Sequence, residues 1–280
     1  MNRDFLEAEL HGKAAGVEYD HGRNLHTITG ARAALNRLFE GKAPKSIIDV
    51  GCGRGTWLRA ALELGAELVR GVDGVAIADS DLLFPRERFL QCDLAAPLEL
   101  GERFDVAICL EVAEHLEPDA SAALVASLAR HADLIYFSAA APGQLGQHHV
   151  NCQWPDYWQR LFNQHGFVCD DRPRQLLWNL EEIEPWYRQN MFVARLAPDL
   201  AGKEEPLRPL VHPAMLEGRV FDLFAREQKA GIACVEAGFM PVSWYLSIVP
   251  RAAAAKLKRR FRKQDRDAES IAGPPVGAKA

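Results

Sequence analysis

The stretch Ser46–Thr56, SIIDVGCGRGT, decides the fold of this chain. A short run dominated by Ile and Val comes first, which is typical of a buried strand. Gly51, Gly53 and Gly55 follow in a GxGxG spacing, and glycine adopts backbone angles that other residues avoid. Thr56 then begins a helical pattern, so the free N–H groups of a helix N-terminus come directly after the turn. The stretch therefore predicts a strand, a ligand-binding turn and a helix.

The same alternation of strands and helices continues to residue 196. Nearly continuous apolar strands are typical of a parallel sheet covered on both faces. We therefore expect an α/β fold with a Rossmann-like doubly wound sheet, mostly parallel with a late antiparallel strand, and helices on both faces. The expected strands are 46–50, 68–73, 89–92, 104–110, 133–138, 167–169 and 191–196, and the expected helices are 56–64, 118–131 and 154–165.

Composition fits one sizeable domain with a smaller appendage. The chain has 280 residues, 48% of them hydrophobic, and a net charge of -5, which argues against general disorder and against a nucleic-acid partner. Six cysteines without a CxxC pair indicate reduced thiols. The start of the sequence is charged, without an apolar signal core, and no apolar run is long enough to span a bilayer. We expect a soluble, cytoplasmic protein.

The expected organisation has four parts, and their boundaries follow changes in composition. A segment rich in prolines and charges begins at Asp199 and reads as a linker, and the last ten residues are rich in Gly, Pro and Ala. The parts are an N-terminal helical lead-in (1–45), the α/β domain (46–198), a C-terminal extension (199–250) and a basic, partly disordered tail (251–280).

The glycine turn differs from a dinucleotide-binding fingerprint. That fingerprint is GxGxxG, and its last glycine would fall at position 56, where the chain has Thr56. Asp49, just before the turn, would repel a pyrophosphate and suits a ligand with a positive amino group. A nucleotide-sugar or NAD enzyme is therefore disfavoured.

The motif DVGCGRG resembles the first motif of class I S-adenosylmethionine-dependent methyltransferases. The resemblance implies that S-adenosyl-L-methionine is the cofactor. It also implies that Gly51, Gly53 and Gly55 line the methionine part of this cofactor, and that Asp49 helps to hold it.

Three later strand ends carry residue types that extend the resemblance. Asp73 corresponds to the ribose-binding acid, and an ionised carboxylate can accept hydrogen bonds from both ribose hydroxyls. Asp93 corresponds to the acid that contacts the adenine amine, with the backbone of Leu94 beside the ring. Glu111 begins a segment that resembles ExxEHL and is expected near the sulfonium. We expect His115 of this segment to cap or pack rather than to catalyse.

A second candidate site follows the fifth expected strand, in the loop Gly143–Gln153. This loop and the next helix resemble a segment of bacterial small-molecule and sugar-modifying methyltransferases, and Glu184–Asn190 resembles these proteins too. The aligned loop residues are His149, Asn151 and Gln153.

Three interpretations of this loop compete. In the first, His148, His149 and Cys152 bind zinc, but adjacent residues of an extended chain point to opposite faces, so we expect no metal. In the second, His149 is a general base for a hydroxyl, and Asn151 orients it or the substrate. In the third, these residues only fix the loop. The second and third interpretations remain open.

Aromatic residues are candidates for the acceptor wall, because aromatic faces suit sugars and rings. Trp158 is equally well explained as the buried face of its helix. Arg188 is a candidate partner for a phosphate or carboxylate of the acceptor, or else part of a surface ion pair. The expected acceptor-binding residues are His148, Tyr157, Trp158, Trp186, Tyr187 and Arg188.

The basic tail carries the segment KLKRRFRK at 256–263. One interpretation is a weak contact with anionic lipid or a polyanionic acceptor, and a solvated terminal helix is favoured over it.

Together the motifs predict a methyltransferase that acts on a small-molecule or glycan-intermediate acceptor, most simply at oxygen. The alternative, from another functional class, is a catalytically silent protein that binds S-adenosylmethionine and serves as a regulatory module.

Overall fold

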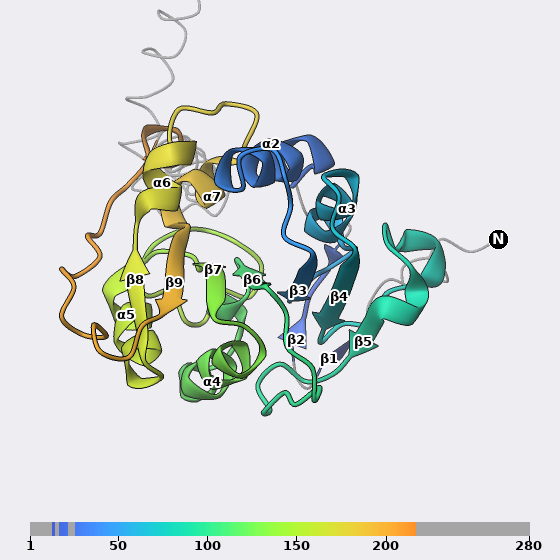
Figure 1. Ribbon diagram of the computed structural model, residues 1–280, viewed down its shortest axis with the longest axis horizontal. Coiled ribbons are helices and arrows are strands. Elements are labelled where there is room, and N and C mark those ends of the chain that lie inside the picture. The colour runs from blue at the N-terminus through green and yellow to red at the C-terminus, as the bar shows by residue number, and fades with distance from the viewer. Residues whose placement is uncertain (1–12, 15–16, 22–25, 217–280) are drawn as a thin grey trace, which may run out of the picture. The chain divides into compact units, whose positions relative to one another are not determined.

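The computed structural model describes residues 13–14, 17–21 and 26–216 (Figure 1). These residues belong to one compact unit that ends at Arg219. The later part of the expected extension and the whole basic tail, with its expected contact with lipid or polyanion, lie outside the described residues.

A seven-stranded sheet forms the centre of this unit. Its strand order is β5-β4-β3-β6-β7-β9-β8, and β9 alone runs in the opposite direction to the other six strands of this sheet. The expected doubly wound, mostly parallel sheet with a late antiparallel strand is therefore confirmed. The strands are β3 (Ser46–Val50), β4 (Leu68–Asp73), β5 (Phe89–Gln91), β6 (Val106–Leu110), β7 (Leu134–Ser138), β8 (Phe167–Asp170) and β9 (Phe192–Leu196).

Helices cover both faces of the sheet, as expected. Figure 1 shows α2, α3, α6 and α7 on one face and α4 and α5 on the other. The α-helices are α2 (Ile28–Leu38), α3 (Thr56–Glu63), α4 (Ser121–His131), α5 (Pro155–Gln164), α6 (Arg172–Leu177) and α7 (Pro185–Asn190). The 3-10 helices are η2 (Asp79–Asp81), η3 (Arg86–Arg88), η4 (Ala113–His115) and η5 (Pro118–Ala120).

The alternation of side chains along a strand builds two cores. Ile47 packs with α2 and α3, whereas Ile48 packs with α4 and α5, and both side chains are fully buried. Burying each such side chain contributes about 1.5–3 kcal/mol to the free energy of folding. A strand with apolar side chains on both sides therefore favours a sheet with helices packed on both faces.

The N-terminal lead-in contains more than the expected helix. The strands β1 (Lys13–Ala14) and β2 (Val17–Glu18) form an antiparallel pair before α2. Thr27 caps α2, because its Oγ1 accepts a hydrogen bond of 2.9 Å from the Gly30 N–H. The sequence did not predict the strand pair, whose strands have only two residues each.

The segment 199–216 contacts the α/β domain, although the sequence predicted a linker over residues 199–213. Leu207 is buried in the core, and its N–H donates to Gln159 Oε1 of α5 at 2.7 Å.

The cysteines of the described part are free: Cys52, Cys92, Cys109, Cys152 and Cys169. No helix in the described part has the length and apolar character that crossing a bilayer requires.

Candidate active site

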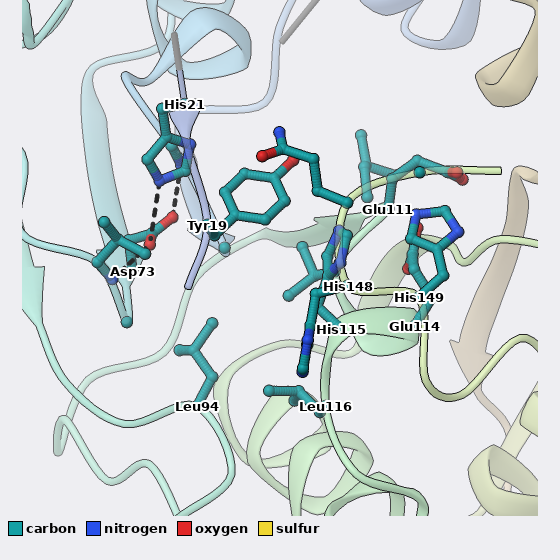
Figure 2. Close-up of a pocket in the computed structure, with 18 of the residues that line it drawn as sticks. Tyr19, His21, Asp73, Leu94, Glu111, Glu114, His115, Leu116, His148 and His149 are labelled. Carbon is teal, nitrogen blue, oxygen red and sulfur yellow. Dashed lines mark hydrogen bonds and ion pairs between the residues drawn. The ribbon is translucent and has the colours of Figure 1, made fainter. Parts of the chain in front are cut away.

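A pocket of about 550 Å³ opens at the carboxyl ends of β3, β4 and β6. Ligands of open α/β sheets bind at this edge, where the strand order reverses. The pocket extends from Asp73 at one end to His149 at the other, with His115 between them (Figure 2). Most of the expected site residues line it: Asp49, Gly51, Gly53, Asp73, Asp93, Leu94, Glu111, His148, His149, Trp186 and Tyr187.

The glycine turn after β3 forms one wall of the pocket. Gly51 has a φ of 85°, and a Cβ atom at this position would lie only 2.2 Å from Val112 Cγ2. Gly55, which was expected to line the pocket too, is absent from its wall. Gly55 is instead the N-cap of α3 and packs against Phe84, whose ring leaves no room for a side chain there.

Asp73 connects the end of β4 to the glycine turn. Its Oδ2 accepts a hydrogen bond of 2.7 Å from the Gly53 N–H, and its Oδ1 accepts one of 2.8 Å from the Val75 N–H. Burial, and then the negative charge of Asp73, raise the pKa of Asp49 well above its usual range. A cationic ligand group beside these two acids would relieve their repulsion.

Asp93 and Leu94 follow β5 at the same edge of the sheet. Asp93 Oδ1 accepts a hydrogen bond of 2.9 Å from the Ala95 N–H, and Leu94 is buried. Cys92, which precedes Asp93, donates its backbone N–H to the carbonyl oxygen of Asp73, so the ends of β4 and β5 are hydrogen-bonded to each other. The two acids thus border one end of the pocket, as expected.

Glu111 lies at the end of β6 with a strained backbone. Its φ is 56°, and its N–H donates to Ser138 O (2.9 Å) and Ser138 Oγ (3.1 Å) of β7. Its carboxylate accepts hydrogen bonds from Gln144 Nε2 (2.7 Å) and Asn190 Nδ2 (3.0 Å). Burial raises the pKa of Glu111, while these hydrogen bonds act in the opposite direction.

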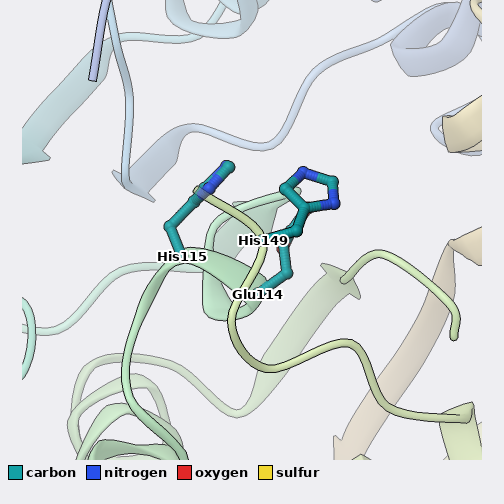
Figure 3. A group of neighbouring side chains, drawn as sticks. All are labelled: Glu114, His115 and His149. Atoms are coloured by element: carbon teal, nitrogen blue, oxygen red, sulfur yellow. The ribbon is translucent and has the colours of Figure 1, made fainter. Parts of the chain in front are cut away.

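Glu114, His115 and His149 form a group of potential ligands deep in the pocket (Figure 3). Burial, and then the charge of Glu111, raise the pKa of Glu114 well above its usual range. Burial and the neighbouring His149 lower the pKa of His115 to about 4, and burial lowers the pKa of His149. Both imidazoles are therefore neutral near pH 7. The sequence assigned no role to Glu114 and only packing to His115.

Asn151 holds the loop rather than facing the pocket. Its side chain is 1% exposed, and Nδ2 donates to Ser121 Oγ at 2.9 Å and Ala113 O at 3.4 Å. The N–H groups of Val150 and Asn151 also donate to Glu114 O, at 2.9 and 3.1 Å. These bonds fix the loop against η4. His149 Nδ1 contacts Gln144 O at 3.1 Å instead of the Asn151 side chain that was expected to orient it.

Three expected acceptor residues lie away from the pocket. Trp158 is 1% exposed and packs against Phe137 in the core, with Tyr157 beside it, because the apolar face of α5 covers the sheet. Arg188 is buried on α7 and donates to Trp178 O at 3.4 Å. Trp186 and Tyr187, the preceding residues of α7, do line the pocket, since successive helical residues point in different directions.

The N-terminal segment Tyr19–His21 adds residues that the sequence did not reveal. Tyr19 contacts the His115 ring at a centroid distance of 4.7 Å, and His21 Nε2 lies 3.6 Å from Asp73 Oδ1 (Figure 2). Gln147 joins this segment to the loop through two bonds with the Asp20 backbone. No motif marks the segment, which precedes the glycine turn by about 30 residues in the sequence.

The family model described as "Methyltransferase domain" matches residues 19–183, which is more than half of the chain. The chain belongs to this methyltransferase family. Members of the family bind S-adenosylmethionine or its demethylated product, and the sheet order is that of the class I methyltransferases. The resemblance stated from the motifs is therefore confirmed.

Curated relatives of this methyltransferase domain are enzymes named "Ubiquinone biosynthesis O-methyltransferase". The protein from Stutzerimonas stutzeri (strain A1501) is 32% identical over 125 residues, which cover 41% of this chain and 52% of the relative. The protein from Nitrosospira multiformis is 27% identical over 152 residues, covering 49% and 62%. The matches thus span 52% and 62% of the length of these two relatives, which is less than two thirds of each.

Solved structures with similar folds include two methyltransferases. The sugar N-methyltransferase KedS8 from Streptoalloteichus sp ATCC 53650 has a TM-score of 0.47 and 16% identity, and the match covers 63% of this chain and 90% of that one. The magnesium protoporphyrin IX methyltransferase from Synechocystis PCC 6803 has a TM-score of 0.44 and 20% identity, covering 61% and 81%.

The pocket fits the cofactor of the family. Gly51 leaves space that a Cβ atom would fill, so a ligand can approach the backbone closely. Asp49 and Asp73 are two buried acids that line the pocket, and a positive amino group of a ligand beside them would relieve their repulsion. Asp73 and Asp93 offer carboxylates at the far end of the same cavity.

Proposed function

We propose that this protein transfers a methyl group from S-adenosylmethionine to a hydroxyl oxygen of a small-molecule or glycan-intermediate acceptor. The observation that carries the proposal is the continuity of one pocket, from the strand-end acids to the imidazoles of His115 and His149. A cofactor at one end and an acceptor at the other would meet inside a single cavity.

In the cofactor half of the pocket, we assign one part of the ligand to each wall. Asp73 accepts hydrogen bonds from the ribose hydroxyls, and Asp93 with Leu94 binds the adenine. The glycine turn and Asp49 hold the methionine part, where the buried acid attracts the amino group. When bound, S-adenosylmethionine supplies an electrophilic methyl group on its sulfonium.

The acceptor half contains His148, His149, Trp186 and Tyr187. The aromatic side chains favour an acceptor with an apolar face. His149 lines the pocket and would take the proton of the acceptor hydroxyl, and the hydrogen bonds of Asn151 would hold the loop that carries His149. Oxygen as the methylated atom is supported by the names of the curated relatives, which are O-methyltransferases.

Replacing Asp73 with Asn tests the cofactor half. The carboxylate accepts from the Gly53 and Val75 N–H groups with different oxygens, whereas an amide keeps only one acceptor oxygen. We expect Asp73→Asn to weaken binding of the demethylated cofactor at least tenfold in isothermal titration calorimetry. The control is Asp79→Asn, an exposed acid on η2, which should bind as the unmodified protein does. Failure of the unmodified protein to bind would contradict the proposal.

The acceptor class is tested by transfer of a labelled methyl group. The protein is incubated with methyl-labelled S-adenosylmethionine and, in separate reactions, with phenols, catechols, hydroxylated sugars and amines. We expect label in products of the hydroxyl compounds. Label in the amine products alone would contradict methylation at oxygen and leave the cofactor assignment intact.

A further inference from the structure

Glu114, His115 and His149 bring three potential metal ligands together at the acceptor end of the pocket. One carboxylate oxygen and one ring nitrogen from each histidine all lie within 4.8 Å of one another (Figure 3). Divalent transition ions bind such atoms at about 2.0–2.2 Å, which places ligands of one ion roughly 3–4 Å apart. Side-chain movements of about 1 Å would let the three atoms share an ion.

Glu114 is a buried acid that makes no ion pair within the described part of the chain. Its side chain is 0% exposed, and neither carboxylate oxygen makes a hydrogen bond of normal geometry within the described part of the chain. None of the ion pairs among the described residues includes Glu114 or its neighbour Glu111. A buried carboxylate is strongly disfavoured unless a cation or hydrogen-bond donors compensate its charge. The pocket therefore has a defined place for a positive ion.

The backbone holds the three side chains in place before any ligand arrives. Glu114 and His115 share the single turn of η4, and the loop that carries His149 is bonded to Glu114 O by two backbone N–H groups. His149 Nδ1 lies 3.1 Å from Gln144 O. A histidine that donates one N–H to a backbone carbonyl keeps its other nitrogen free to bind a metal, an arrangement common in metal sites.

We propose that Glu114, His115 and His149 bind one divalent transition-metal ion, of the kind represented by Mn²⁺ and Zn²⁺. One carboxylate and two imidazoles are a ligand set that these ions accept, and three protein ligands leave positions open for water or substrate. The sequence-based prediction of no metal considered His148, His149 and Cys152. The proposed site shares only His149 with that trio and takes its other two ligands from the segment after β6.

A cation at this site could activate the acceptor hydroxyl for methyl transfer. This role of the cation rests on the proposed function. A hydroxyl oxygen bound at an open position would lose its proton to solvent more readily, because a bound cation stabilises the resulting oxyanion. His149 then binds the ion and is not the proton acceptor. The two roles of His149 exclude each other, so metal binding can decide between them.

Titration with Mn²⁺ tests the site without relying on catalysis. The full chain is stripped with a chelator, and free Mn²⁺ is followed by electron paramagnetic resonance as protein is added. We expect one Mn²⁺ per chain, with affinity reduced at least tenfold in Glu114→Gln and in His149→Asn. The control is Glu117→Gln, an exposed acid three residues after Glu114, which should keep the original Mn²⁺ affinity.

Thermal unfolding separates a metal ligand from a merely structural acid. Mn²⁺ should raise the Tm of the unmodified protein and leave the Tm of Glu114→Gln unchanged, because a ligand stabilises only the folded state that binds it. Without metal, Glu114→Gln should unfold at the same or a higher temperature, since the substitution removes a buried acid that makes no ion pair and lies beside the acid Glu111. This measurement also shows that the variant folds.

Titration with the demethylated cofactor, run in parallel, distinguishes the two proposals. Cofactor binding without any Mn²⁺ binding up to millimolar concentration would overturn the cation site alone. Mn²⁺ binding that both substitutions leave unchanged would also overturn it. Mn²⁺ binding that depends on Glu114 and His149, without cofactor binding, would support the cation site and contradict the proposed methyl transfer.

Discussion

Gly51 and Gly101 both have a positive φ, but a side chain would strike a neighbour only at Gly51. A Cβ atom at Gly101 would have nothing within 4 Å, whereas at Gly51 it would meet Val112 of the segment after β6. The glycine turn thus needs Gly51 for its conformation and also for the close approach of two strand ends. That contact joins the cofactor wall to the segment that carries Glu114.

Gly51→Ala and Gly101→Ala form a matched pair that separates the free-energy cost of backbone strain from the cost of the steric clash with Val112. We expect Gly101→Ala to lower the free energy of unfolding by about 1 kcal/mol through backbone strain. Gly51→Ala should cost roughly 2–4 kcal/mol, because overpacking adds to that strain. Urea unfolding gives both values, and calorimetry should show weaker cofactor binding for Gly51→Ala only. Equal losses in the two variants would mean that contact with Val112 is unimportant.

At the scale of elements, hydrogen bonds to the Glu204 side chain connect the segment 199–216 to α5 and β8. One carboxylate oxygen accepts three hydrogen bonds, from Gln159 Nε2, Asn163 Nδ2 and the Cys169 N–H, at 3.0, 2.7 and 3.1 Å. Partial burial raises the pKa of Glu204, but these hydrogen bonds outweigh it and lower the pKa from 4.5 to about 2. The charged form is therefore the one that the folded state stabilises.

The stability that Glu204 contributes should depend on pH. A carboxyl with a lowered pKa stabilises the fold above its ordinary value of 4.5, and the contribution disappears as the pH falls towards 2. We expect Glu204→Gln to cost about 1 kcal/mol at pH 7 and progressively less between pH 4.5 and 2. Urea unfolding over this range measures it, with Glu205→Gln, an exposed neighbour, as the control. A cost that is the same at pH 7 and pH 2.5 would show that charge is not involved.

At the scale of the whole described unit, the pocket is lined by parts of the chain that are distant in sequence. Asp20 and Gln147 are 127 positions apart, and Gln147 Oε1 and Nε2 bond to the backbone N–H and C=O of Asp20, at 3.2 and 3.0 Å. His21 then lies beside Asp73 on the opposite wall. The N-terminal segment therefore spans both halves of the site.

Gln147→Ala should loosen this closure without altering the cofactor contacts. Loss of two net hydrogen bonds of about 1 kcal/mol each predicts that the demethylated cofactor dissociates roughly tenfold faster or more. Stopped-flow displacement measures this rate. Gln164→Ala, an exposed residue at the end of α5, is the control and should leave the rate unchanged. An unaltered rate for Gln147→Ala would indicate that Tyr19–His21 does not restrict the exit of the ligand.

The sequence by itself determined the sheet and predicted most of the strand-end residues that line one half of the pocket. Strand periodicity and the glycine turn are local signals, and Asp49, Asp73 and Asp93 each lie at or just after the carboxyl end of a parallel strand, so all three reach the same edge. The acceptor half depended on tertiary structure. Whether Trp158 faces the core or the pocket depends on which face of α5 covers the sheet, and no local pattern reports that. The same holds for Glu114 and His149, which are 35 positions apart and meet only because the loop after β7 is bonded to η4.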